Sequence, residues 1–138
     1  MLSGITAKKE KLMTPHKFPF SIAYADTDAG GIVYHARYIE IAERARMKWL
    51  SHAVPPNGDI GFVIRDLHVK YIKPLRLGDD FVVETTAPDM GAASLKIEQK
   101  FVKNGEIYAI LTGSAAYIGR DYKPKRIPDE YVKHMKKV

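Results

Sequence analysis

The alternation of hydrophobic and polar residues predicts most of the structural elements of this chain. Between residues 17 and 24, aromatic and aliphatic side chains occupy every second position, which is the period of a strand with one buried face. Similar alternation, or an enrichment in β-branched residues, returns over residues 61–72, 81–86, 95–101 and 106–118. Asn104-Gly105, between the last two segments, supplies the residues of a two-residue hairpin turn. Pro19 favours an edge position for the first strand.

One stretch has the spacing of a helix instead. Apolar side chains recur three and four residues apart at Tyr38, Ile41, Ala42, Ala45 and Trp49. The run from Pro55 to Gly58 ends this helix, because proline cannot continue it. Small residues at 42, 45 and 53 permit close approach to strands, so we expect this helix to be more buried than most. Residues after Pro128 fit either a solvated end or an amphipathic helix packed on the surface.

The order of these elements, one strand, one helix and four strands, predicts an α+β fold. With a single helix and consecutive antiparallel strands, the economical arrangement is one curved sheet wrapped around one long helix. A length of 138 residues fits one domain. Residues 1–16 show no period and are expected to form a flexible N-terminal arm, with residues 17–138 as the domain.

Composition and charge exclude several classes of protein. The chain has no cysteine, which excludes disulfides, thiolate metal sites and a cysteine nucleophile. No stretch has the length and hydrophobicity of a signal peptide or a membrane span, so a cytoplasmic protein is expected. The net charge of +6 comes from the two ends of the chain. Residues 1–17 carry +3, residues 120–138 carry +4, and the rest carries −1. Without aromatic and basic residues interleaved, nucleic acid is not an expected partner.

The segment before the helix, "YADTDAGGIVYHARYIEIAERAR", carries the candidate chemistry. Asp26-Thr27-Asp28 begins like a calcium loop, but the twelfth position is Arg37 where a glutamate belongs. The five histidines, at positions 16, 35, 52, 68 and 134, are too scattered to suggest a zinc pair. We therefore expect no metal site.

The same segment can supply an oxyanion site and a carboxylate. A helix N-terminus offers unpaired backbone N–H groups, and Gly30 and Gly31 let the backbone approach a ligand closely. Asp28 or Asp26 could attack a carbonyl or take a proton from water, and His35 could assist a leaving group. These parts suit acyl transfer to water. The purely structural interpretation stays open here, because aspartate before a helix is a common N-cap and Asp-Gly pairs are common in turns.

The stretch "DTDAGGIVYHARYIEIAERAR" closely resembles the signature of the YbgC-type branch of the 4-hydroxybenzoyl-CoA thioesterase family, and "YIKPLRLGDD" resembles its link between the second and third strands. Members are hotdog-fold acyl-CoA hydrolases. The resemblance implies a five-stranded antiparallel sheet around one long helix. It further implies protomers paired edge to edge, as dimers or homotetramers, with active sites between protomers.

Residue by residue, the resemblance makes Asp28 the catalytic carboxylate, as nucleophile or general base, and Asp26 a structural residue. The thioester carbonyl would be polarised by a backbone N–H near His35, with Gly31 allowing close approach. The His35 side chain marks this branch and argues against a hydroxybenzoyl substrate. Tyr34 and Tyr38 would line the acyl pocket or the protomer interface, and Glu43 would be structural or contact the partner chain.

The implied substrate is a small or medium acyl-CoA, or an acyl group on a carrier protein, and no cofactor is expected beyond the coenzyme A of the substrate. The phosphates of coenzyme A call for cations, and the candidates are Lys70, Lys96, Lys100, Arg120 and Lys123. Two alternatives remain: a non-catalytic module that binds acyl-CoA, and a hotdog dehydratase that would pair Glu43 with His35.

Overall fold

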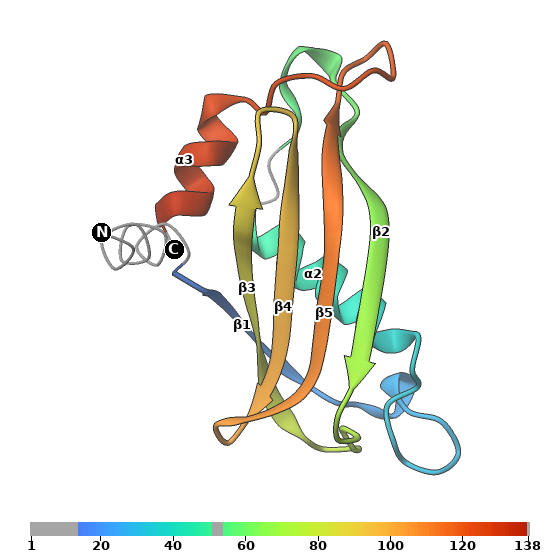
Figure 1. Ribbon diagram of the computed structural model, residues 1–138. Coiled ribbons are helices and arrows are strands. Elements are labelled where there is room, and N and C mark those ends of the chain that lie inside the picture. The colour runs from blue at the N-terminus through green and yellow to red at the C-terminus, as the bar shows by residue number, and fades with distance from the viewer. Residues whose placement is uncertain (1–13, 51–53, 138) are drawn as a thin grey trace.

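The computed structural model describes residues 14–50 and 54–137 of the chain (Figure 1). The strands are β1 (His16–Ser21), β2 (Gly61–Tyr71), β3 (Asp80–Met90), β4 (Ser94–Lys103) and β5 (Glu106–Ile118). The α-helices are α2 (Arg37–Trp49) and α3 (Asp129–Lys137), and short 3₁₀ turns cover Tyr24–Asp26 and Pro56–Gly58. Residues 1–13 of the predicted arm lie outside the described residues. β1 begins at His16, which is the last residue of the predicted arm.

The five strands form one antiparallel sheet in the order β1-β3-β4-β5-β2, and α2 lies across one face of it (Figure 1). The predicted α+β class and the five strands are thereby confirmed. β1 is an edge strand, as Pro19 predicted, because a proline without an N–H cannot serve two neighbours. The other edge is β2, which pairs only with β5 among the described strands.

Two details of the strands follow directly from their residues. β3 continues four residues past the predicted end at Thr86, although Pro88 lies within it. The pairing of β3 with β4 shifts between Thr86 and Asp89, so the proline falls in an irregularity where no ladder hydrogen bond is needed. The hairpin turn is confirmed: Asn104 and Gly105 both have positive φ, 50° and 77°.

The face of the sheet toward α2 forms the hydrophobic core. Ile41, Ala42 and Ala45 of α2 are completely buried, which confirms the expected close approach of the helix to the sheet. The third small residue, Ala53, lies outside the described residues. Gln99 of β4 is also completely buried, and its Nε2 donates hydrogen bonds to the Ala42 carbonyl and to Thr85 Oγ1. Its Oε1 accepts a hydrogen bond from Arg46 Nη1, so this amide joins helix and sheet.

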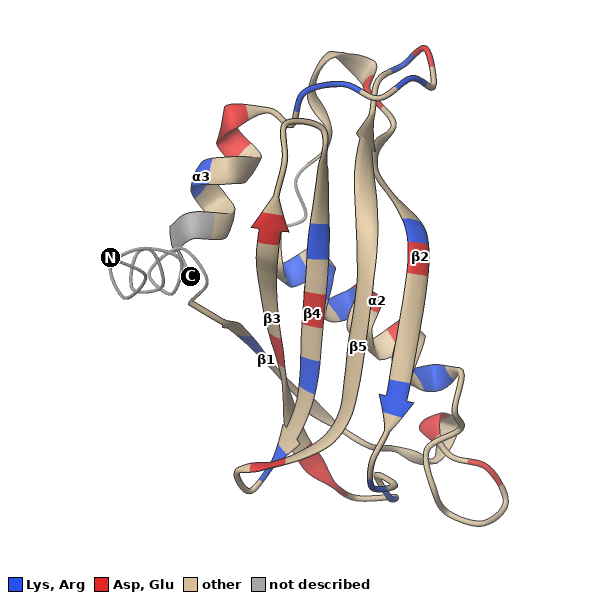
Figure 2. Cartoon of the chain, viewed as in Figure 1, with Lys and Arg blue, Asp and Glu red and all other residues tan. Residues whose placement is uncertain are grey.

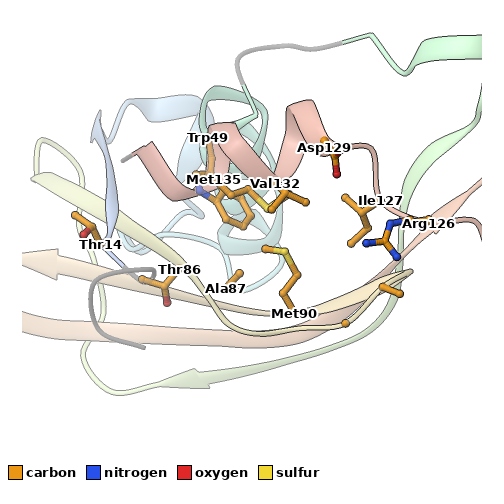
Figure 3. A pocket seen from close by; sticks show the side chains of 12 residues that line it. Thr14, Trp49, Thr86, Ala87, Met90, Arg126, Ile127, Asp129, Val132 and Met135 are labelled. Atoms are coloured by element: carbon orange, nitrogen blue, oxygen red, sulfur yellow. The ribbon is translucent and has the colours of Figure 1, made fainter. Parts of the chain in front are cut away.

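A second helix corrects the expectation of one long helix. α2 has 13 residues, and the core beyond its C-terminal end is covered by α3, which buries Tyr131 and Met135. Figure 3 shows Trp49, Met90, Val132 and Met135 gathered between α3 and the sheet, around a hollow of about 320 Å³. A second cover is required because the strands extend beyond Trp49, where their apolar face would otherwise meet water. Of the two interpretations of the residues after Pro128, the packed helix is therefore confirmed.

Replacing Gln99 by leucine should lower the free energy of unfolding by about 2–4 kcal/mol, because the Ala42 carbonyl, the Thr85 hydroxyl and the Arg46 guanidinium lose a buried partner. Urea denaturation of the variant measures the change. Ser94→Ala on an exposed position of the same strand is the control and should stay within about 0.5 kcal/mol. Equal stability of Gln99→Leu and the wild type would contradict the role of this amide.

Candidate active site

Asp26 connects the end of β1 to the start of α2. Its side chain is buried; Oδ2 accepts a hydrogen bond from the Ala23 N–H at 2.8 Å, and Oδ1 accepts one from Arg37 Nε at 2.7 Å. Its carbonyl accepts from the Tyr34 N–H at 3.2 Å. Hydrogen bonds from Arg37 to Glu40 and to Asp26 raise the pKa of this guanidinium. Asp26 therefore occupies the structural position that the resemblance implied.

Asp28, two residues later, is exposed. Its Oδ1 accepts a hydrogen bond from the Gly30 N–H at 2.8 Å, and no described residue donates to its Oδ2. A side chain at residue 30 would start 3.2 Å from Oδ1, so this glycine leaves room for the carboxylate. Gly31 has a φ of 79°, which favours glycine, whereas a Cβ there would meet nothing within 4 Å. Gly31 thus sets the course of the turn.

The start of α2 has no side-chain cap. Its N-cap residue is Ala36, so the interpretation of Asp26 or Asp28 as the cap of this helix is wrong. The Arg37 N–H is used by the Tyr34 carbonyl, but within the part of the chain that the structure describes, the N–H groups of His35 and Ala36 donate to no acceptor. An N–H group without an acceptor at a positive helix end suits a developing oxyanion, and of these two residues His35 lines the cavity beside Asp28.

Asp28 and this helix start share one cavity of about 430 Å³. The predicted site residues Tyr34, His35 and Tyr38 line it together with Asp28, whereas Gly31 does not. The Tyr34 and His35 rings are 4.5 Å apart, and both side chains are exposed. The Tyr38 hydroxyl accepts a hydrogen bond from the Leu75 N–H, and burial raises the pKa of Tyr38. Tyr38 is therefore a fixed wall of the cavity.

The other wall comes from residues 71–74, the end of β2 and the segment that follows it, a part of the chain that holds no predicted site residue. It contributes the lining residues Tyr71, Ile72, Lys73 and Pro74. The Tyr71 hydroxyl donates to the His35 carbonyl at 2.6 Å, and Lys73 pairs with Glu106. The only signal for these residues was the resemblance of "YIKPLRLGDD", which by itself says nothing of what they contact.

The five candidate cations for coenzyme A lie in two other places within the chain. Lys70, Lys96 and Lys100 lie on the sheet face opposite α2, since their neighbours Val69, Ile97 and Gln99 face the core. Lys100 pairs with Glu98 at 3.7 Å. Arg120 and Lys123 lie on the loop after β5, at the end of the sheet opposite the Asp28 turn (Figure 2). None of the five lines the Asp28 cavity.

The dehydratase pair of Glu43 and His35 is likewise separated. Glu43 lines a different cavity of about 190 Å³, with Arg46 and Met47 of α2, whereas His35 lines the Asp28 cavity. The two residues are eight positions apart along the helix start and do not share a wall within one chain. Burial lowers the pKa of the neighbouring Arg46.

Residues 14–50 and 54–137 contain neither a metal cluster nor a membrane-spanning helix. In these ranges no three histidine, aspartate or glutamate side chains gather closely enough to hold a metal ion. No helix there is long and apolar enough to cross a membrane.

The antiparallel sheet with α2 across one face is the arrangement that the resemblance to hotdog-fold thioesterases implied. The profile of the thioesterase-like superfamily matches residues 22–135, and the chain belongs to this superfamily. It is 32% identical over 120 residues to the acyl-CoA thioesterase YbgC of Haemophilus influenzae, covering 82% of this chain and 88% of that protein. The acyl-CoA thioester hydrolase YbgC of Escherichia coli O6:H1 is 33% identical over 131 residues, or 89% and 97% of the two chains.

Solved structures agree with these relatives. A protein described as a probable thioesterase from Bartonella henselae superposes with a TM-score of 0.73 at 28% identity, covering 83% of this chain and 98% of that one. The predicted family is confirmed, and with it the class of enzyme, a thioesterase.

Replacing Asp26 and replacing Asp28 should lower the free energy of unfolding by different amounts. Asp26→Ala should lower the free energy of unfolding by about 3 kcal/mol, because the Ala23 N–H and Arg37 lose a buried acceptor. Asp28→Ala, the matched control, should lose less than about 1 kcal/mol, since its side chain is exposed and accepts one hydrogen bond. Chemical denaturation measures both, and equal losses would contradict the assignment of the structural role to Asp26.

Proposed function

We propose that this thioesterase hydrolyses the thioester of a small or medium acyl-CoA to a free acid and coenzyme A. The observation that carries the proposal is the cavity that places Asp28 beside the helix start, where the His35 N–H donates to no described residue. The names of the relatives, acyl-CoA thioesterase and acyl-CoA thioester hydrolase, support coenzyme A as the thiol. An acyl carrier protein presents the same thioester and is the second candidate donor.

Asp28 is the group that drives the reaction. The Gly30 N–H holds Oδ1, which leaves Oδ2 to attack the thioester carbonyl or to take a proton from the attacking water. Attack on the carbonyl gives an anhydride that water then hydrolyses, whereas proton abstraction gives the acid directly. Both routes pass through a tetrahedral oxyanion, and the N–H group of His35 stabilises it. His35 assists the departure of the thiolate.

The reaction as proposed needs no metal ion or other cofactor. The carboxylate supplies the nucleophile or base, and the helix start supplies the charge stabilisation that a metal would otherwise provide. Tyr34 and Tyr38 bound the space beside Asp28 and limit the acyl group that fits there.

We further propose that the site is completed by a second copy of the chain paired along β2. β2 is an edge strand, and exposed apolar side chains gather on it and on α2: Ile39, Met47, Val63, Ile64, Tyr71 and Ile72. Covering such a surface and the free backbone groups of the edge is favourable. Two such dimers would form the tetramer that the resemblance implies.

Pairing about a two-fold axis would also bring Arg120 and Lys123 of one chain close to the Asp28 cavity of the other. Antiparallel pairing of β2 with its copy puts residue 71 of one chain near residue 61 of the other. Gly61 is paired with Ile118, so the Arg120 and Lys123 loop of the second copy would come next to the Asp28 cavity. There the two cations would bind the phosphates of coenzyme A.

Asp28→Asn should lower kcat by about 10²- to 10⁴-fold, because the amide can neither attack nor accept the proton of water. Thiol release from short, long and aromatic acyl-CoA esters, measured with EDTA present, tests this and ranks the substrates. Asp89→Asn, at an exposed acid on β3, is the control. Turnover of Asp28→Asn near that of the wild type would reject the mechanism. Binding of the esters by the wild type without thiol release would identify a non-catalytic module.

Mixed dimers test whether a site draws on two chains. The Asp28→Asn and Arg120→Ala variants are each expected to have low thioesterase activity at low acyl-CoA concentration. In a mixed dimer one site carries both changes and the other carries neither, so random co-expression should restore about a quarter of wild-type activity. Each variant alone is the control. No recovery in the mixed sample would place Arg120 in the site of its own chain, and full activity of Arg120→Ala alone would place it outside any site.

A further inference from the structure

The loop that follows β5 presents an aromatic ring among cations. Four basic residues lie within residues 120–126: Arg120, Lys123, Lys125 and Arg126. Asp121 is the only acid in this range. Tyr122 lies among them, and its side chain is 76% exposed. Figure 2 shows the loop at the end of the sheet opposite the Asp28 turn. The loop therefore offers a flat ring and positive charge to the same ligand.

Hydrogen bonds hold the backbone of this loop. The Gly119 N–H donates to the Lys123 carbonyl at 2.9 Å, and the Tyr122 N–H donates to the Gly119 carbonyl at 3.0 Å. The Lys123 N–H donates to Asp121 Oδ1 at 3.1 Å. Within this turn Tyr122 has a φ of 66°, an uncommon conformation for a large side chain. Such conformations persist where the surroundings impose them, and they are frequent at ligand sites.

Three of the four cations are free to bind a ligand. Lys125 is not one of them, because its Nζ pairs with the buried Asp59 at 3.0 Å. Over residues 14–50 and 54–137, no carboxylate lies within ion-pair distance of the remaining three side chains, Arg120, Lys123 and Arg126. Exposed and unpaired cations of this kind bind phosphates.

An aromatic ring beside phosphate-binding cations is a pattern that fits a nucleotide. A planar base stacks on the ring, while the cations bind the phosphates. One ring can stack one base, so the loop suits a single nucleotide better than a nucleic-acid strand. Coenzyme A carries adenosine with a 3′-phosphate and a 5′-pyrophosphate. The phosphopantetheine arm of an acyl carrier protein has a phosphate and no base.

We propose that Tyr122 stacks on the adenine of coenzyme A, so that this loop selects coenzyme A over a carrier protein as the thiol. The inference rests on the proposed function and on the pairing along β2, which would bring the loop next to the Asp28 cavity of the second copy. The adenine lies far from the reacting carbonyl along the coenzyme. Stacking therefore strengthens the binding of substrate and transition state equally, which lowers KM and leaves kcat unchanged.

The test is Tyr122→Asn, because asparagine adopts a positive φ more readily than most residues and so preserves the turn. We expect KM for an acyl-CoA to rise about 10-fold at constant kcat, and KM for the matching acyl-pantetheine, which lacks the nucleotide, to stay unchanged. Tyr122→Phe keeps the ring and should behave as the wild type. Tyr24→Asn is the matched control, since the Tyr24 side chain is 82% exposed and lies outside this loop.

Binding of adenosine 3′,5′-bisphosphate separates failure of the inference from failure of the proposed function, because this probe contains no thioester. In calorimetry, the wild type and Tyr122→Phe should bind it about 10-fold more tightly than Tyr122→Asn. No binding by the wild type, or equal binding by Tyr122→Asn, would overturn the inference. An equal rise in KM for acyl-pantetheine would also overturn it. If the wild type hydrolyses no thioester, the proposed function fails, and the calorimetry alone decides whether Tyr122 holds the adenine.

Discussion

The buried carboxylate of Asp26 connects the end of β1 to the first turn of α2, where the candidate active site lies. A carboxylate without water is stable only when donors surround it, and here those donors are the Ala23 N–H at the exit of β1 and Arg37 in the first turn of α2. The segment between these donors has little freedom once both hydrogen bonds are made. Asp28 lies within that segment, so the hydrogen bonds of the buried Asp26 carboxylate also determine where the Asp28 carboxylate lies.

The sheet supplies the second restraint on the site, and it does so from far away in sequence. Tyr38 of α2 accepts a hydrogen bond from the Leu75 N–H, and the Tyr71 hydroxyl donates to the His35 carbonyl, so the end of β2 and the segment after it hold the helix start. The same strand is the free edge of the sheet. Under the proposed pairing, the end of one strand would carry both the contact between protomers and a hydrogen bond to the helix start, which would link assembly to the geometry of the site.

Packing at the far end of the sheet has a different purpose. Trp49 ends α2, while the strands continue, and Tyr117 and Leu95 would be left facing water. α3 covers them with Tyr131 and Met135. The Tyr117 hydroxyl donates to the buried Asp59, and Lys125 and the Arg120 backbone also donate to this carboxylate, so the loops at this end are connected to the core. This end gives the fold stability and contributes no side chain to the Asp28 cavity.

The sequence by itself determined the five strands, the central helix and the acid-glycine turn, because periodicity, turn residues and helix-ending prolines act over short distances. It also identified the family, through the 21 contiguous residues from Asp26 to Arg46. Local pattern alone did not separate the roles of Asp26 and Asp28, since both are acids in the same turn and only the fold buries one and exposes the other. The cations could not be placed because charge has no period.

The tertiary structure alone decided which distant residues meet. Tyr71 and Lys73 line the Asp28 cavity, whereas Glu43 and His35 line different cavities. Lys70, Lys96 and Lys100 lie on the sheet face opposite α2. The physical reason is that strand order and register, which arise from the packing of all the elements together, set these distances.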